Sequence, residues 1–190
     1  MATFSTLDFG IDGGIARITL NRPDAANGIS MQLAQELLQA SIACRCSPQV
    51  RAVLLTGKGR MFCAGGDLNS FVENSANLEG FIKELTTYLH AAIANFAHMR
   101  APLIIAVNGA AAGAGFSLAA CGDLVLAARS AKFSMAYTGA GLVPDASVAK
   151  DPLFAQILAR RTNRSLYDPA RPVPAVAWQA MAEAVKPYPL

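Results

Sequence analysis

The stretch Gly109-Ala-Ala-Ala-Gly-Ala-Gly-Phe-Ser-Leu-Ala119 decides the fold, and it follows closely on the apolar run Leu103-Ile-Ile-Ala-Val107. The apolar run is typical of a buried strand, whereas the stretch after it carries almost no side-chain chemistry. Glycine lets a backbone approach a ligand closely, and the first N–H groups of a helix have no partner within that helix. The stretch therefore predicts a strand followed by a short helix that meets a ligand through its backbone.

A second glycine-rich segment follows another predicted strand. Phe62-Cys-Ala-Gly-Gly-Asp-Leu68 comes after Arg51-Ala-Val-Leu-Leu-Thr56. In α/β folds, ligands bind at the carboxyl ends of strands, where both segments fall. Two N–H groups converging from separate loops would polarise a carbonyl oxygen and so form an oxyanion hole without side chains. A single Gly-Ala run more often only allows tight packing of a helix on a sheet, so the hypothesis depends on the pair.

The pattern around these segments alternates between strands and helices and predicts an α/β layered fold with mostly parallel buried strands. Glycine, proline and hydrophobic periodicity delimit the elements. In chain order we first expect a β-hairpin over residues 4–20, then a helix capped by Ser30 with the apolar stripe Leu33, Leu37, Leu38 and Ile42, and then a strand to Thr56. A longer helix over Leu78–Met99 follows, with the apolar stripe Ile82, Leu85, Leu89, Ile93 and Phe96. A strand over 103–107, a short helix and a strand over 123–128 complete the order.

Length and proline content predict the domain organisation. The chain has 190 residues, of which 53% are hydrophobic, and this suits one domain with a sizeable core. Six of its ten prolines follow residue 150, where a helix or an inner strand would be hard to sustain. We therefore expect a core domain over residues 1–150 and an irregular tail with short helices over residues 151–190.

Charge and cysteine content narrow the choice of partners. The net charge is only +3, and the 16 Lys and Arg residues are scattered, so we expect neither a nucleic-acid partner nor a membrane. The four cysteines form no C-x-x-C pair, and the sequence predicts no metal site. The glycine order is not G-x-G-x-x-G, which disfavours a dinucleotide site. The absence of a leader-like segment predicts a cytoplasmic protein.

Eight short motifs carry a specific resemblance. They are Thr19-Leu-Asn-Arg-Pro-Asp24, Phe62-Cys-Ala-Gly-Gly-Asp-Leu68, Ala101-Pro102, Asn108-Gly109, Ala112-Gly-Ala-Gly115, Cys121-Gly-Asp123, Ala131-Lys-Phe133 and Gly141-Leu-Val-Pro-Asp145. In this order they resemble the enoyl-CoA hydratase/isomerase family, also called the crotonase family. The resemblance implies a crotonase-like ββα superhelix with a reduced C-terminal helical part. It also implies a homotrimer or hexamer, which the short C-terminus would weaken.

The resemblance also assigns site residues. It implies that the backbone N–H groups of Gly66 and Ala114 hold the thioester oxygen of an acyl-CoA. Coenzyme A would enter as part of the substrate, and no tightly bound cofactor is implied. The residues that the resemblance places along the CoA arm or beside the oxyanion hole are Arg22, Asp24, Ala25, Ala26, Ala64, Gly65, Asp67, Leu68 and Gly113.

The side chains opposite the oxyanion hole would select the reaction. Hydratases of the family use two glutamates, and this chain has Ser117 and Tyr137 at those positions, so hydration is disfavoured. Asp145 occupies a position where isomerases carry a functional aspartate, and one carboxylate suffices to move a proton between two carbons. We therefore expect an enoyl-CoA isomerase with Asp145 as acid and base. Without the resemblance, an Asp after a proline would more simply stabilise a turn.

Two alternatives remain open at this point. In the first, the chain resembles a hydrolytic 4-chlorobenzoyl-CoA dehalogenase, with Asp145 as nucleophile, His90 activating water and Tyr137 as an aromatic hydrogen-bond donor. A lone histidine beside a helical apolar stripe is more often a satisfied structural residue. In the second alternative, the protein binds acyl-CoA without turnover.

Overall fold

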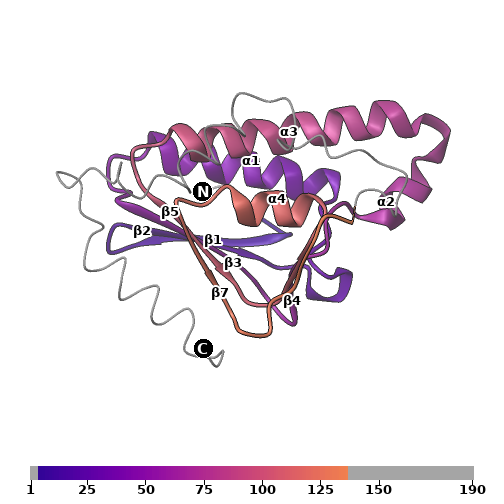
Figure 1. The fold of residues 1–190 in the computed structure, drawn as a ribbon. Coiled ribbons are helices and arrows are strands. Elements are labelled where there is room, and N and C mark those ends of the chain that lie inside the picture. Colours follow the sequence, from indigo (N-terminus) through magenta and orange to yellow (C-terminus); the bar gives the residue numbers. More distant parts are fainter. Residues whose placement is uncertain (1–3, 137–190) are drawn as a thin grey trace.

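The structure, a computed structural model, describes residues 4–136. Its elements, in chain order, are β1 (Leu7–Asp12), β2 (Ile15–Leu20), η1 (Pro23–Ala25), α1 (Met31–Cys46), β3 (Ala52–Gly57), β4 (Met61–Cys63), α2 (Leu68–Glu73), η2 (Ser75–Asn77), α3 (Leu78–His98), β5 (Leu103–Val107), β6 (Ala110–Ala112), α4 (Ala114–Ala120), β7 (Leu124–Ala127) and β8 (Phe133–Ser134). The strands form a five-stranded sheet in the order β1-β2-β3-β5-β7 and a three-stranded sheet in the order β4-β6-β8. The helices α1 and α3 lie side by side over one face of the larger sheet (Figure 1).

The N-terminal hairpin forms as predicted. Asp12 pairs with Ile15, so the turn consists of the two glycines Gly13 and Gly14. Both have positive φ angles, +57° and +84°, as the favoured two-residue hairpin turns require. Glycine reaches these angles without steric cost. The turn thus makes β1 and β2 antiparallel, while the other strand pairs within residues 4–136 are parallel.

The central strands of the larger sheet are apolar on both faces. β3 pairs in parallel with both β2 and β5, and β5 is buried along its whole length. Parallel sheets are usually covered on both faces, so their strands are continuous hydrophobic runs. The predicted bounds of the strand over residues 103–107 agree with the structure. The carboxyl ends of β3 and β5 lie together because Thr56 pairs with Ala106.

The two long helices bury most residues of the expected stripes. Ser30 caps α1 by accepting a hydrogen bond from the N–H of Leu33 at 3.3 Å. In α3, four of the five predicted inward residues are buried, and Ile82 is partly exposed. Ile42 in α1 was predicted to face inward, but it is 45% exposed. The prediction was wrong because Ile42 follows Leu33 by nine residues, which at about 100° per residue places it on the opposite face.

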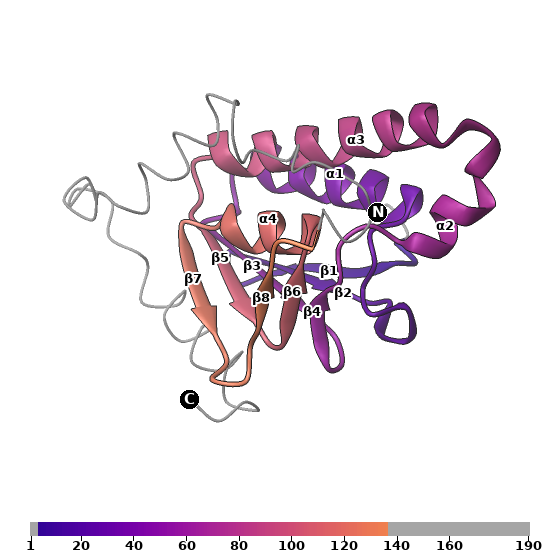
Figure 2. The ribbon, with the colours of Figure 1, turned by 45° about the vertical axis from the view of Figure 1, so that its right-hand side comes forward.

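The small sheet was not predicted. Figure 2 shows β4, β6 and β8 side by side, with β6 between the other two. We expected the Gly-Ala stretch to open a helix directly, but residues 110–112 first form β6, which pairs with β4 and β8. Alanine has a low strand propensity, and a segment of three residues is too short to show a periodic pattern. The parallel β4–β6 pair brings the segments after Cys63 and after Ala112 to one edge.

Several predictions lie outside the described residues. Tyr137 and Asp145 belong to the part of the chain that the structure does not describe, as does the expected boundary near residue 150. The tail over residues 151–190 lies there too. These expectations remain predictions.

Candidate active site

The two glycine-rich segments meet, as the sequence predicts. Gly65 has a φ of +100°, and a Cβ at this position would lie 2.8 Å from the carbonyl oxygen of Ala112 and 3.4 Å from the nitrogen of Ala114. On the other side, a Cβ at Gly113, whose φ is +51°, would lie 3.9 Å from the Cα of Gly65. The close approach therefore depends on the missing side chain of Gly65, whereas Gly113 has room for a Cβ and is favoured there by its positive φ.

Gly66 and Ala114 each present a backbone N–H that is not used within the fold. Within residues 4–136, neither N–H donates a hydrogen bond to the protein, and both residues are partly exposed. Ala114 is the first residue of α4, where a helical N–H has no partner in its own helix. Two unpaired donors thus project from adjoining loops. This arrangement suits an external oxygen acceptor.

Packing behind the loops requires small residues. A Cβ on Gly66 would lie 2.6 Å from Cζ of Phe71, and a Cβ on Gly115 would overlap the backbone of Cys63. Cys63 itself is fully buried, and burial raises the pKa of its thiol to about 12. A thiol that stays protonated is a poor nucleophile. Cys63 is therefore a small packed residue.

An ion pair holds the first glycine loop. Nη2 of Arg22 lies 2.7 Å from Oδ2 of Asp67, and Nη1 of Arg22 donates to the carbonyl of Gly28. Burial would raise the pKa of the Asp67 carboxyl, but the hydrogen bond and charge of Arg22, with two backbone N–H donors, outweigh it and lower that pKa. Asp67 is thus a carboxylate that also caps α2 by accepting from the N–H of Asn69 at 3.1 Å.

Apart from Gly113, which precedes α4, the residues that the resemblance placed along the CoA arm or beside the oxyanion hole lie in two adjoining loops. The N–H of Ala64 donates to the carbonyl of Ala26 at 3.0 Å, which joins the loop of residues 22–28 to that of residues 64–68. Asp24, Ala25 and Leu68 are exposed, and Leu68 is 60% exposed. The structure thus brings these residues together on an accessible edge beside Gly66.

Two buried asparagines shape these loops, and the sequence analysis assigned a role to neither. Asn27 is fully buried with a φ of +52°, and its Oδ1 accepts from the N–H of Arg22 at 2.9 Å. Its Nδ2 donates to the carbonyls of Lys58 and Met61 at 3.0 and 2.9 Å. Asn108 holds the same turn from β5, donating to the Gly59 carbonyl at 2.8 Å. Asparagine adopts positive φ more readily than other non-glycine residues, and this was the available signal for Asn27.

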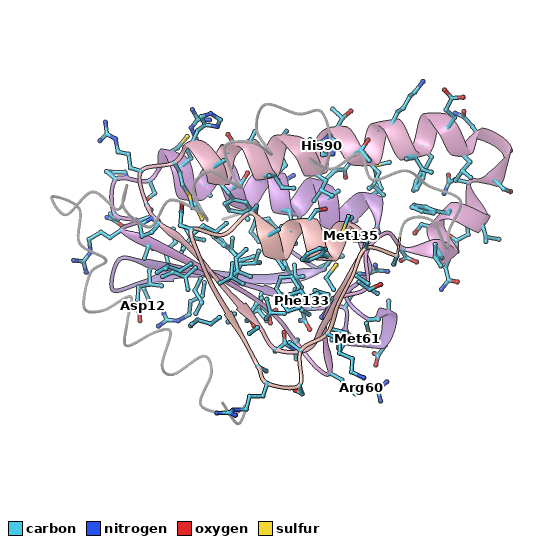
Figure 3. The ribbon with its side chains drawn as sticks, viewed as in Figure 1. Asp12, Arg60, Met61, His90, Phe133 and Met135 are labelled. Carbon is cyan, nitrogen blue, oxygen red and sulfur yellow. The ribbon has the colours of Figure 1, made fainter. Side chains whose placement is uncertain are left out.

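His90 and Ser117 come from helices on the same side of the large sheet. Figure 3 shows His90 on α3, with α4 on that same side. The Nε2 atom of His90 is buried and has no hydrogen-bond partner among the described atoms. Ser117 is buried on α4, where the hydratases of the family would carry a glutamate. Polar atoms buried without a partner are uncommon in proteins, which keeps His90 among the candidate site residues.

Within residues 4–136, no three His, Cys, Asp or Glu side chains are grouped so that they could hold a metal ion. Across the same residues, no helix combines the length and the hydropathy needed to cross a bilayer.

Comparisons with known proteins identify relatives of similar sequence. The chain is 42% identical over 144 residues to a Rhodobacter capsulatus protein named "Probable enoyl-CoA hydratase", covering 76% of this chain and 54% of the relative. It is 39% identical to the 1,2-epoxyphenylacetyl-CoA isomerase of Escherichia coli, covering 71% and 52%. It is 33% identical to the 4-chlorobenzoyl coenzyme A dehalogenase-2 of an Arthrobacter species, covering 70% and 49%. The chain thus spans about half the length of these relatives.

A solved structure and a family model agree with these relatives. An enoyl-CoA hydratase from Polaromonas sp. JS666 matches with a TM-score of 0.69 at 32% identity, covering 80% of this chain and 61% of that one. The fold is therefore the mixed α/β crotonase fold that the sequence predicted. The family model described as Enoyl-CoA hydratase/isomerase matches residues 10–173. The chain belongs to the enoyl-CoA hydratase/isomerase family.

Proposed function

We propose that the protein binds an acyl-CoA thioester and stabilises enolate charge on its carbonyl oxygen with the N–H groups of Gly66 and Ala114. The observation that carries the proposal is the pair of unused N–H donors on two loops in contact. As an α-proton leaves, negative charge develops on the oxygen, so preorganised donors stabilise the transition state more than the ground state. Each donor contributes about 3 to 4 kcal/mol in comparable sites. Coenzyme A is part of the substrate, and no tightly bound cofactor is required.

The reaction that we propose is a double-bond shift in an enoyl-CoA. Asp145 removes a proton from one carbon and returns it to another, while the oxyanion hole holds the enolate between the two steps. Ser117 provides no carboxylate, so the two-glutamate chemistry of hydration has no counterpart on α4. The similarity to the Escherichia coli 1,2-epoxyphenylacetyl-CoA isomerase supports an isomerase. The loops of residues 22–26 and 64–68, with Gly113, would carry the CoA arm.

A second candidate function is supported by His90. Its buried Nε2 has no partner within residues 4–136, and the Arthrobacter dehalogenase is a relative. In this alternative, the Asp145 carboxylate attacks the halogen-bearing aromatic carbon and halide leaves. His90 then takes a proton from water, which hydrolyses the aryl ester and restores the carboxylate. Tyr137 would donate a hydrogen bond to the bound substrate.

The full assembly is also a proposal. We propose a homotrimer or hexamer, as the resemblance to the family implies. A protein that binds acyl-CoA without turnover is the remaining alternative. Loss of catalysis with retained binding would distinguish it from both enzymes.

The test combines binding and turnover in the full chain. We expect calorimetry to detect a CoA thioester, and we expect isomerisation of a 3-enoyl-CoA to disappear in Asp145→Asn. Halide release from 4-chlorobenzoyl-CoA that needs both Asp145 and His90 would favour the dehalogenase. The Glu79→Gln variant is the control, because its carboxylate is exposed on the first turn of α3. Absence of CoA-thioester binding would overturn all three candidates.

A further inference from the structure

We infer that Asp67, Arg22 and Asn27 form a positioning network that sets the direction of the Gly66 N–H. The inference rests on the proposed function, because it concerns the donor that would bind the thioester oxygen. None of the three side chains needs to touch the reacting carbons. They would act through the backbone of the first glycine loop.

The first glycine loop pairs with the segment around Ile29. The N–H of Ile29 donates to the carbonyl of Gly65 at 2.7 Å, and the N–H of Asp67 donates to the carbonyl of Ile29 at 3.1 Å. Gly66 lies between these two bonds, opposite Ile29, in a parallel bridge. In a parallel bridge, the residue between the two bonded neighbours directs its own N–H and C=O away from the partner. The pairing with Ile29 therefore aims the Gly66 N–H outward.

Side chains on both segments hold Ile29 and Asp67 in register. Asp67 contacts Arg22 through its carboxylate, and Arg22 also donates to the carbonyl of Gly28, the residue before Ile29. The backbone N–H of Arg22 is held by Oδ1 of Asn27. One guanidinium thus connects both strands of the bridge, from Asp67 on one side to Gly28 on the other.

The network is also connected to the rest of the fold. Through Nδ2, Asn27 donates to Lys58 and Met61, which flank the turn between β3 and β4. The Asn27 side chain is fully buried, and the Asp67 side chain is 9% exposed. Desolvating an ion pair offsets much of its attraction, so its burial is weak evidence for a role in stability. A satisfied buried network instead fixes one geometry, which an oxyanion donor requires.

The experiment uses the full chain with cinnamoyl-CoA as the probe. Polarisation of its conjugated carbonyl moves the absorption band to longer wavelength, so the shift reports on the N–H donors. We expect Asp67→Asn to show a much smaller shift than the unmodified protein when both are saturated with the probe. If the enzyme turns over an enoyl-CoA, kcat should fall about tenfold to a hundredfold, since small misplacement of a catalytic donor is that costly. Arg22 and Asp67 also lie in the loops proposed to carry the CoA arm, so a rise in Kd or KM reports on that contact, and such a rise with an undiminished shift at saturation would overturn the positioning role.

Two further variants separate positioning from stability. The Glu36→Gln variant alters another buried carboxylate, which accepts from Ser5 and Thr6, remote from the glycine loops in sequence. It should leave the absorption shift unchanged. Arg22→Lys keeps the positive charge but loses the planar fork, and it should also reduce the shift. It replaces Asp67→Asn as the test if that variant does not fold.

The outcomes distinguish the two proposals. If the unmodified protein binds no cinnamoyl-CoA or shows no absorption shift, the proposed function fails, and this inference fails with it. If the unmodified protein shows the shift and both Asp67→Asn and Arg22→Lys retain it in full, only the positioning network is overturned. An equal loss of the shift in Glu36→Gln would also overturn it, because the effect would then be general destabilisation.

Discussion

Gly65 shows how the site depends on a single missing side chain. Its φ of +100° is unfavourable for any L-residue with a Cβ, and the Cβ would lie 2.8 Å from the carbonyl oxygen of Ala112. We expect Gly65→Ala to lower the free energy of unfolding by about 1–3 kcal/mol, as overpacking does elsewhere. It should also separate the two loops and weaken CoA-thioester binding. Urea denaturation and calorimetry measure the two effects.

The control for this prediction is Gly10→Ala in β1. A Cβ on Gly10 would meet no atom within 4 Å, and its φ is not positive. The variant should therefore stay within about 0.5 kcal/mol of the unmodified protein, as surface substitutions usually do. Equal stability and binding in Gly65→Ala and Gly10→Ala would contradict the steric argument.

At the scale of elements, Glu36 fastens the segment before β1 to helix α1. Its carboxylate accepts from Oγ1 and N–H of Thr6 at 2.6 and 2.9 Å and from the N–H of Ser5 at 3.1 Å. Burial would raise the pKa of Glu36, but these hydrogen bonds together outweigh burial and lower that pKa below 4.5. A lowered pKa in the folded state means that the folded protein favours the carboxylate.

This interaction predicts how stability changes with pH. Its contribution is fully present above the unfolded pKa of 4.5 and is lost as pH falls through the lower folded value. We expect Glu36→Gln to lower the free energy of unfolding at pH 7 by about 1–3 kcal/mol, because buried donors lose a charged acceptor. The variant should also lose less stability below pH 4.5 than the unmodified protein does. Urea melts from pH 3 to pH 7 check this.

The exposed carboxylate of Glu79 provides the control at this scale. It pairs with Lys83 one turn along α3, in solvent. Exposed pairs of this kind contribute little to stability. The free energy of unfolding of Glu79→Gln should therefore depend on pH as that of the unmodified protein does. If Glu36→Gln lost as much stability below pH 4.5 as the unmodified protein, the role given to Glu36 would be contradicted.

At the scale of the whole molecule, the strand order predicts where the fold opens last. β3 lies at the centre of the five-stranded sheet, between the parallel neighbours β2 and β5, whereas β1 and β7 form its edges. Central buried strands exchange their amide hydrogens only in the larger openings of a protein. We expect hydrogen exchange to be slowest in β3 and β5 and faster in β7. Protection of β7 that outlasts β3 would contradict the topology.

The elements that the sequence predicted well are those with long or strongly periodic patterns. The hairpin over residues 4–20, α3 and β5 were delimited by glycine pairs, by a stripe spaced at three and four residues, and by Pro102. Ile42 shows the limit of predicting burial from apolar character alone, because its position around the helix axis places it on the exposed face of α1. The strands β4 and β6 each span three residues, and their formation depends on pairing with each other.

In the candidate site, too, some features could be predicted from the sequence and others could not. The glycine segments and the family motifs were visible in the sequence because backbone donors require small residues at fixed positions. The roles of Asn27 and of the Arg22–Asp67 pair were not visible, since their partners lie 31 to 45 residues away along the chain. Such contacts depend on which loops the sheets bring together.

The sequence by itself determined the family, the larger elements and the two loops that converge at the site. Local periodicity and glycine conformations are properties of short segments, so they can be inferred before the chain is folded. The tertiary structure alone decided the small sheet, the unused N–H groups and the network behind Gly66. These features depend on long-range hydrogen bonds and on burial, which exist only after distant segments have packed together.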